Sequence, residues 1–369
     1  MCWLRVLLSS GSSTDADDER SDTSTVLSSG EMDPDSIYEN TNNKYISLQE
    51  AGKGTNGQVT FCARRPSLVA SPLMTNLTAQ GPGLVAMKIA SREMFHDRIA
   101  IEIIALRRIR SSFAAEDNKT TVKHLPNLID FDPIVNGGSR WLAVHPIRGF
   151  DLERLRVVIT HTIKPSSPNS VTYSFSFPAI PEVFVLHIAK QLTGAVGWLH
   201  DIANIAHNDV FGGNVMLDLS SWDKGPDFTM PTIVLIDFNR ASLNTNEKEK
   251  GADRSFVYEL IRMLDSTGRA SSQRAHELED TSTPKRSHTW WDVFISFLKI
   301  NNSQYLQEKS STFTRFKDQF GTEINRRLKE VTEDEVRQVQ GLLDMFAEKE
   351  VRFPSEDRIR EILEQREDG

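Results

Sequence analysis

The chain has 369 residues, with 43 Lys and Arg against 51 Asp and Glu, which gives a formal net charge of −8. This acidic balance argues against a dedicated nucleic-acid-binding protein, whose binding surface would be basic. Two cysteines, Cys2 and Cys62, are too few for a disulfide framework or a zinc site. Arg5 interrupts a first apolar run too short for a signal peptide, and no longer run is typical of a membrane span. We therefore expect a soluble intracellular protein, cytoplasmic or nuclear, that does not bind membranes.

Residues 9–36 differ in composition from the rest, with twelve Ser or Thr, eight acidic residues and one basic residue. Such a segment cannot bury enough apolar surface to offset the entropy that ordering costs. We therefore predict a disordered, Ser- and Asp-rich tail over residues 1–43. Its hydroxyl groups are either phosphorylation sites or simply solvated, and the sequence leaves both readings open.

β-prone runs and one amphipathic helix follow the tail. Apolar residues at helical spacing between Ile99 and Ile109 predict the helix. Prolines and glycines predict a loop over residues 64–83. The predicted strands are Tyr45–Glu50, Val59–Ala63, Leu84–Ile89, Ile129–Pro133 and Trp141–Val144.

The second half is mainly helical, most clearly over residues 181–200. Ser, Pro and Thr predict loops over residues 160–181 and 266–288. Strands followed by helices are typical of an α+β protein. We therefore predict a small β-rich lobe over residues 44–147 and a larger α-rich lobe over residues 148–369.

A glycine-rich segment, GKGTNGQV, lies between the first two predicted strands and places candidates at Gly52, Gly54, Gly57 and Val59. Glycines let the backbone approach phosphate oxygens closely, because no Cβ obstructs the approach. No helix pattern follows the glycines, which disfavours a dinucleotide-binding fold. A glycine-rich hairpin turn explains the segment about as well as a phosphate-binding loop does.

Lys88 lies near the end of a predicted strand, in the run VAMK, and Glu102 lies on the amphipathic helix that follows. A lysine that binds phosphates needs a carboxylate to hold its long side chain in place, and Glu102 is a candidate for that partner. Taken alone, the two residues are more simply explained as solvated charges.

Two polar segments in the second half supply the chemistry. The run HNDVFGGN contains Asp209 and Asn214, and the run IVLIDFN ends an apolar strand at Asp237. This spacing suits metal-assisted phosphoryl transfer, in which one carboxylate orients the incoming hydroxyl while an amide and a second carboxylate hold Mg²⁺. Asp209 fits the first role, and Asn214 and Asp237 fit the second.

These motifs, in this order, resemble a eukaryotic-type protein kinase domain from about Tyr45 to about Leu363. The resemblance implies a bilobal protein-kinase-like fold that moves the γ-phosphoryl group of Mg-ATP to a hydroxyl, above all of protein Ser or Thr. The roles it implies are phosphate contact by Lys88, pairing of Lys88 with Glu102, catalytic base for Asp209, and Mg²⁺ ligation by Asn214 and Asp237.

Further stretches agree with the resemblance. The run VHPIRGFDL resembles the hinge of these kinases, so that main-chain groups of His145 and Ile147 would face adenine and Asp151 would hold a ribose hydroxyl. Asp253 matches the helix aspartate that supports the catalytic loop.

The chain departs from the family pattern at several positions. Asn208 replaces the arginine that pairs with a phosphorylated activation loop. Phe211 replaces a lysine, so a cation near the transferred phosphoryl group is missing. Asn239 replaces a glycine, and Asn tolerates positive φ well enough to keep the turn. Only 15 residues separate Asp237 from Asp253, without the A-P-E motif.

Three functions therefore compete. The first is a protein kinase acting on Ser or Thr, favoured by the complete phosphate and metal set. The second is a small-molecule phosphotransferase on the same fold, favoured by the short activation segment. The third is an inactive pseudokinase that serves as an interaction module, for which Phe211 and Asn208 are the best support. The sequence does not determine the oligomeric state.

Overall fold

The computed structural model describes most of the chain, in thirteen separate segments. They are residues 44–54, 57–65, 83–114, 123–156, 158–163, 171–176, 180–220, 230–276, 289–304, 313–346, 353–355, 357–359 and 361–362. The predicted tail over residues 1–43 and most of the predicted loop over residues 64–83 lie outside them. The chain divides into two compact units. The first holds residues up to Ala100, Ile129–Pro146 and those from Pro354 on, and the second holds Ile101–Leu128 and Ile147–Phe353.

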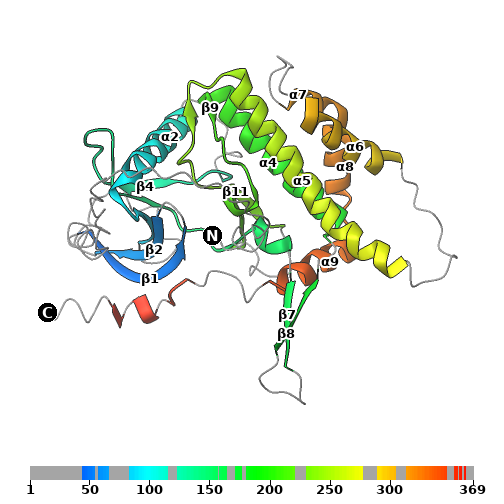
Figure 1. Ribbon diagram of the computed structural model, residues 1–369, viewed down its shortest axis with the longest axis horizontal. Coiled ribbons are helices and arrows are strands. Elements are labelled where there is room, and N and C mark those ends of the chain that lie inside the picture. The colour runs from blue at the N-terminus through cyan, green and yellow to red at the C-terminus, as the bar shows by residue number, and fades with distance from the viewer. Residues whose placement is uncertain are drawn as a thin grey trace, which may run out of the picture. The chain divides into compact units, whose positions relative to one another are not determined.

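The first unit is built on a five-stranded sheet in the order β1-β2-β3-β5-β4 (Figure 1). β1 pairs with β2, β2 with β3, and β3 with β5, and all three pairs are antiparallel. All five predicted strands are confirmed, one of them with the predicted ends and the others with ends that differ by one to three residues. The strands are β1 (Tyr45–Lys53), β2 (Gly57–Arg64), β3 (Leu84–Ala90), β4 (Leu128–Phe131) and β5 (Trp141–Val144).

Alternation along β3 determines which face of the sheet is packed. Val85, Met87 and Ile89 join a buried cluster with Tyr45 and Trp141. Successive strand residues point to opposite faces, so Lys88 lies on the face opposite this cluster. The predicted helix is α2 (His96–Ala114), and the division between the units falls within it.

The second unit is mainly helical. In Figure 1, α5 runs alongside α4, and α5 also packs on α6. Its helices are α4 (Glu182–Trp198), α5 (Glu247–His276), α6 (Thr289–Gln304), α7 (Thr314–Phe316), α8 (Thr322–Lys329) and α9 (Glu333–Asp344). Its core combines the apolar side of α4 with aromatic residues, among them Phe294, Phe316 and Phe320. The chain is therefore an α+β protein, as predicted.

Short strands complete the second unit. A three-stranded antiparallel sheet has the order β11-β10-β6, and a two-stranded pair joins β9 to β12. A separate hairpin consists of β7 and β8. The bounds are β6 (Gly149–Asp151), β7 (Val158–Ile163), β8 (Val171–Ser176), β9 (Ile205–Ala206), β10 (Val215–Asp218), β11 (Thr232–Leu235) and β12 (Ser242–Leu243).

Two loop predictions are wrong in part. Residues 160–181 contain most of the β7–β8 hairpin, because β-branched and aromatic residues at every second position outweigh the Ser and Pro between them. Residues 266–276 continue α5, which shows that weak helix propensity at Ser and Gly does not end a helix already formed. Residues 277–288 lie outside the described part of the chain.

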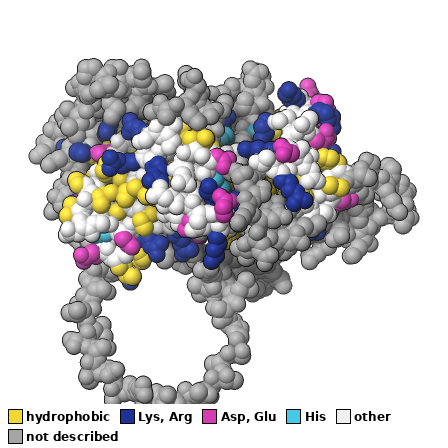
Figure 2. Space-filling model, turned by 90° about the horizontal axis from the view of Figure 1, so that it is seen from above, with side chains coloured by type: hydrophobic (Ala, Val, Ile, Leu, Met, Phe, Trp, Pro, Cys, Tyr) yellow, Lys and Arg dark blue, Asp and Glu magenta, His cyan; other side chains and the backbone are white. Residues whose placement is uncertain are grey.

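Charged side chains of both signs are interspersed on the described surface in Figure 2. Several ion pairs join residues one helical turn apart, such as Arg326 with Glu323 in α8. Among the helices that the structure describes, none combines the length and the apolar character that crossing a membrane requires.

Candidate functional site

In the first unit, strand register aligns three of the predicted nucleotide-binding residues. Gly52 pairs with Val59, Val59 pairs with Lys88, and Lys88 pairs with Leu142. Directly opposed residues in an antiparallel sheet share a face, so this row presents Val59 and the Lys88 amine side by side. Val59 and Lys88 are both half-buried.

The glycines of the segment GKGTNGQV differ in how much space surrounds them. A Cβ on Gly57 would lie 2.2 Å from the carbonyl oxygen of Ile89, so β2 can approach β3 this closely only with glycine there. A Cβ on Gly52 would meet no atom within 4 Å. The N–H of Gly54 donates to the carbonyl of Gly57 at 2.8 Å, which closes the turn between the strands. Close packing therefore explains Gly57, and it leaves Gly52 unexplained.

In the second unit, Asp253 of α5 holds the segment that carries Asp209. Its carboxylate, fully buried, accepts the backbone N–H groups of His207 and Asn208, each at 2.7 Å. It also lies 2.9 Å from Nε2 of His200. The prediction that Asp253 supports this loop is confirmed by these contacts.

Asp209 and Asn214 are in direct contact within the same segment. The Nδ2 amide of Asn214 donates to the carbonyl of Asp209 at 2.9 Å and to its Oδ2 at 3.2 Å. Both partners are acceptors, so the amide nitrogen must face Asp209 and the amide oxygen is left for another ligand. Between them, Gly212 packs so closely on Glu153 that an added Cβ would lie 3.1 Å from its backbone nitrogen.

The β10–β11 pairing brings Asp237 close to Asn214. Val215 is paired with Leu235, so the next residues along the ladder are Asn214 and Ile236. The N–H of Ile236 donates to the carbonyl of Asn214 at 2.8 Å. Asp237 follows at once, with a φ of 66°. A left-handed non-glycine residue is costly and persists only where its surroundings fix it.

The backbone on both sides of Asp237 is fixed. On one side, Nε2 of His207 lies 3.0 Å from the carbonyl of Ile236. On the other, Oε1 of Glu102 accepts the N–H of Phe238 at 3.3 Å, and the His207 ring packs edge-on against the Phe238 ring. Burial lowers the pKa of His207, so its imidazole is neutral and donates from Nε2. These contacts hold the backbone on both sides of Asp237 in one conformation.

The turn after Asp237 differs from the prediction in one respect. Positive φ was expected to be tolerated at Asn239, but the left-handed residues here are Asp237 and Asn208, with φ of 66° and 61°, and Asn239 is not among them. Nδ2 of Asn208 donates to the carbonyl of Arg240 at 3.2 Å and to Oγ of Ser242 at 2.8 Å. Asn208 therefore connects the Asp209 segment to the segment that follows Asp237.

The predicted hinge residues are distributed over both units. His145 belongs to the first unit, whereas Ile147 and Asp151 belong to the second. Asp151 lies in β6, where its carboxylate accepts the N–H of Arg154 at 3.2 Å and forms an ion pair with its guanidinium at 3.3 Å. Burial raises the pKa of Asp151, and the Arg154 charge opposes that rise.

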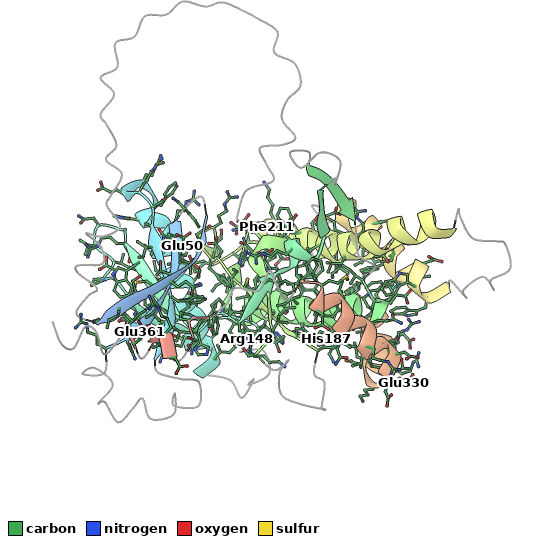
Figure 3. All side chains as sticks on the ribbon, turned by 90° about the horizontal axis from the view of Figure 1, so that it is seen from below. Glu50, Arg148, His187, Phe211, Glu330 and Glu361 are labelled. Atoms are coloured by element: carbon green, nitrogen blue, oxygen red, sulfur yellow. The ribbon has the colours of Figure 1, made fainter. Side chains whose placement is uncertain are left out.

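Sequence reasoning missed two sets of contacts, one made by Arg240 and one made by three histidines. Nη1 of Arg240 lies 3.5 Å from Oδ1 of Asp209, across 31 residues of chain that carry no pattern to reveal it. Phe211, labelled in Figure 3, is 42 % exposed although it lies only two residues from Asp209.

Three histidines form the second set, because each contacts a backbone carbonyl at or next to β11. Burial lowers the pKa of all three, and that of His187 falls to about 4. The pairs are His124 Nδ1 with Ile233 (3.0 Å), His187 Nε2 with Pro231 (2.9 Å) and His207 Nε2 with Ile236 (3.0 Å).

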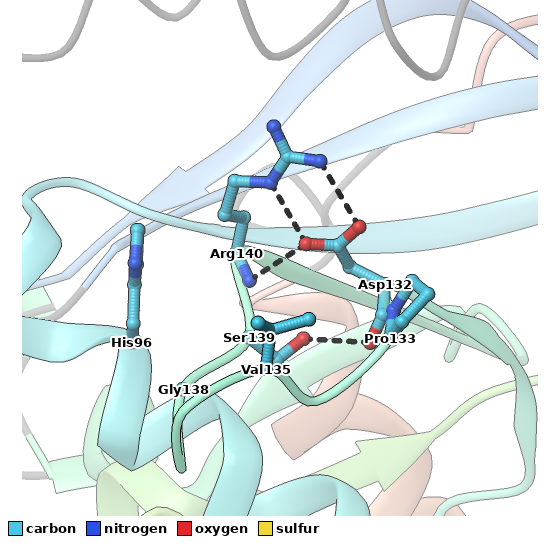
Figure 4. A pocket seen from close by; sticks show the side chains of 7 residues that line it. All are labelled: His96, Asp132, Pro133, Val135, Gly138, Ser139 and Arg140. Carbon is cyan, nitrogen blue, oxygen red and sulfur yellow. Dashed lines mark hydrogen bonds and ion pairs between the residues drawn. The ribbon is translucent and has the colours of Figure 1, made fainter.

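A separate hollow of about 390 Å³ lies in the first unit (Figure 4). Its charged residues satisfy each other, because Nε and Nη2 of Arg140 donate to the Asp132 carboxylate at 2.8 and 3.1 Å. His96, at the start of α2, lines its other side. The hollow contains none of the predicted site residues.

The structure thus brings Asp209, Asn214 and the Asp237 turn together in the second unit, and Gly52, Val59 and Lys88 together in the first. The pairing of Lys88 with Glu102 stays a prediction, since the two residues belong to different units. Among the described residues, no three His, Cys, Asp or Glu side chains are grouped as a metal site would require. No known family model matches the chain, and no curated protein matches it significantly.

Proposed function

We propose that the chain is an ATP-dependent phosphotransferase of the protein-kinase-like type, with the first unit as the small lobe and the second as the larger lobe of a bilobal fold. Its reaction transfers the γ-phosphoryl group of Mg-ATP to a hydroxyl, with protein Ser or Thr as the first candidate acceptor. The observation that carries the proposal is the hydrogen-bonded grouping of Asp209, Asn214 and the left-handed turn at Asp237. Strained residues fixed in this way are typical of functional sites.

Asp209 suits the role of the base. Its carboxylate is half-buried, so it is accessible to a substrate hydroxyl, and one of its oxygens is held by the Asn214 amide. A carboxylate in a fixed place removes the hydroxyl proton as the oxygen attacks. Because Asp253 fixes the backbone of this segment, the base keeps its orientation without help from substrate.

The residues present fit a magnesium ion. The Asn214 amide nitrogen is used by Asp209, which leaves its amide oxygen for a ligand. Asp237, whose backbone follows the Ile236 contact with Asn214, would supply a carboxylate. Oxygen ligands of this kind are those that Mg²⁺ prefers. When bound, Mg²⁺ neutralises charge on the phosphates of the nucleotide. Glu102, through the N–H of Phe238, fixes the turn that carries Asp237.

The first unit suits the phosphates and the base of the nucleotide. Lys88 is a cation in the same row as Val59 and Gly52, on the face opposite the buried apolar cluster. A lysine on a rigid strand positions phosphate oxygens, and a small apolar residue beside it packs on a nucleobase.

A second candidate function, transfer to a small-molecule hydroxyl, is favoured by one observation. Of the 15 residues between Asp237 and Asp253, Ser242 and Leu243 pair with β9, and α5 begins at Glu247. Little of this segment is left to bind an extended peptide. A comparison of γ-phosphoryl transfer from labelled ATP to protein and to small polyols distinguishes the two acceptors.

The primary test measures nucleotide binding through the thermal stabilisation of the protein, with ATP alone and with ATP plus Mg²⁺. We expect Mg-ATP at a hundredfold excess over its Kd to stabilise the wild type by about 2–3 kcal/mol, and ATP without Mg²⁺ to stabilise it less. The increment that Mg²⁺ adds should vanish in Asp237→Asn, a variant that tolerates the positive φ. Asp218→Asn on β10 is the matched control and should keep it.

Three results would contradict the proposal. Absence of any shift with ATP and Mg²⁺ would leave an interaction module without nucleotide chemistry. A magnesium increment that survives in Asp237→Asn would place the metal elsewhere. Full γ-phosphoryl transfer by Asp209→Asn would remove Asp209 from the role of base.

A further inference from the structure

Arg240 is the cation that the structure places against Asp209, with Nη1 3.5 Å from Oδ1. We propose that Arg240 contacts the phosphoryl group during its transfer and supplies the positive charge that Phe211 cannot supply from its place two residues after Asp209. The inference rests on the proposed function and adds a catalytic residue to it.

The backbone of Arg240 is fixed relative to Asp209. Its carbonyl accepts Nδ2 of Asn208, the residue that precedes Asp209, at 3.2 Å. The same amide binds Ser242, which pairs with Ala206 between β12 and β9. These contacts use only the main chain of Arg240, so they persist when its side chain is changed.

The side chain of Arg240, in contrast, is open to solvent. It is 57 % exposed, and in the part of the chain that the structure describes its guanidinium donates to Asp209 alone. A guanidinium has five N–H donors, so most of them remain for a ligand. An exposed ion pair of this kind contributes at most about 1 kcal/mol to stability, and a purely structural role is correspondingly weak.

The chemistry of the transfer requires such a group. The acceptor hydroxyl gives its proton to the Asp209 carboxylate while its oxygen forms a bond to the γ-phosphorus. The bond from that phosphorus to the β–γ bridging oxygen breaks, and the electron pair leaves with ADP. In the transition state, negative charge is spread over the three non-bridging oxygens of the phosphoryl group that is being transferred. The planar fork of an arginine matches two of these oxygens at once.

The position of Arg240 beside the base is what this step needs. A donor near Oδ1 of Asp209 lies close to the oxygen that the base activates, and therefore close to the phosphorus that this oxygen attacks. Removing one preorganised donor of developing charge typically lowers the rate by about 10²- to 10³-fold.

The test uses the full chain and water as the acceptor, so that no protein substrate has to be known. Single-turnover hydrolysis of Mg-ATP is measured for the wild type, Arg240→Ala, Arg240→Lys and Asp209→Asn. The matched control is Arg337→Ala, which removes another exposed arginine from an ion pair, here with Asp334 in α9. Binding of Mg-ATP and thermal midpoints are measured on the same proteins.

We expect Arg240→Ala to lower the rate at saturating Mg-ATP by about 10²-fold while its Kd for the nucleotide changes less than threefold. Arg240→Lys keeps the charge but loses the fork, so we expect partial rescue. Arg337→Ala should match the wild type. Because the main-chain contacts remain, the thermal midpoint of Arg240→Ala should stay within about 2 °C of the wild type.

The possible failures can be told apart. If Asp209→Asn is inactive but Arg240→Ala turns over at the wild-type rate, the role of Arg240 is overturned and the proposed function stands. A change confined to the Kd for Mg-ATP also overturns it, because the residue then acts on the ground state. If the wild type shows no hydrolysis that depends on Asp209, both proposals fall.

Discussion

The imidazole of His207 lies with its Nε2 3.0 Å from the carbonyl oxygen of Ile236. This contact joins the residue two before Asp209 to the residue just before Asp237, so one neutral histidine connects the backbone segments that carry the proposed base and the proposed metal ligand. Its ring is completely buried, and burial keeps it uncharged. The segment that carries the proposed base and the turn that carries the proposed metal ligand are therefore held together by this contact.

Asp253 should be essential to the segment that carries the proposed base. In Asp253→Ala the N–H groups of His207 and Asn208 lose their acceptor inside the protein. Each buried unsatisfied donor costs about 1–3 kcal/mol, so we expect a loss of about 3–5 kcal/mol in the free energy of unfolding. Urea unfolding measures it.

The control for this variant is Asp334→Ala, which removes an exposed aspartate whose partner is also exposed. We expect it to cost less than about 1 kcal/mol. Equal losses of unfolding free energy in the two variants would mean that the buried Asp253 contacts stabilise the protein no more than an exposed ion pair does.

The two glycines of the β1–β2 hairpin should respond differently to a methyl group. Gly57→Ala drives its Cβ into the Ile89 carbonyl, whereas Gly52→Ala meets open space. We expect Gly57→Ala to lower the thermal midpoint by several degrees, since overpacking typically costs about 1–3 kcal/mol, and Gly52→Ala to leave it unchanged.

A second readout separates packing from ligand binding at these positions. If Gly52 gives room to phosphate oxygens, Gly52→Ala should weaken ATP binding without loss of stability. Gly52→Ala with normal affinity would reduce the glycine-rich segment to an ordinary hairpin turn.

Acid should destabilise the second unit through the histidines around β11. The pKa of His187 falls from 6.5 to about 4 on folding, mainly because of burial, and those of His124 and His207 are also lowered. The unfolded chain therefore binds more protons than the folded one below pH 6.5. Stability is complete above that pH and is lost progressively as the pH falls toward 4. Thermal midpoints between pH 7.5 and 4 measure this loss.

Substitution isolates the contribution of His187, which Figure 3 labels within the second unit. His187→Gln removes the titrating group, so its midpoint should decline less steeply than that of the wild type between pH 6.5 and 4. Paired carboxylates such as Glu259 also lose stability in acid, but they do so in both proteins. Parallel pH profiles would show that His187 does not titrate in this range.

Periodic patterns predicted much of the fold, because a buried face repeats along the chain. The strand Trp141–Val144 was placed to the residue, and the helix expected over residues 181–200 begins at Glu182 and ends at Trp198. The β7–β8 hairpin was not predicted, because Ser and Pro at its centre are typical of loops and mask the alternation of β-branched and aromatic residues in the two strands.

The site was predicted only as far as local motifs reach. Asp209 and Asn214 are in contact as expected, because Asn214 lies only five positions after Asp209. Asp237 follows the end of β11, and the pairing of β11 with β10 brings that end next to Asn214. The contact of Arg240 with Asp209 and the bonds from histidines to β11 carbonyls were not foreseen. Single side chains that reach across many residues leave no repeating pattern, so only the folded chain reveals them.

The lysine assigned to the phosphates provides the last prediction. Lys88→Met keeps the length of the side chain on β3 but removes its charge, so the sheet should stay intact while nucleotide phosphates lose their anchor. We expect single-turnover hydrolysis of Mg-ATP to fall by about 10²-fold, with a thermal midpoint close to that of the wild type. Lys53→Met is the matched control, because Lys53 is an exposed lysine at the end of β1, within the glycine-rich segment GKGTNGQV. If Lys53→Met loses turnover and Lys88→Met keeps it, the phosphate anchor is Lys53, and the row of Gly52, Val59 and Lys88 is a structural feature of the sheet.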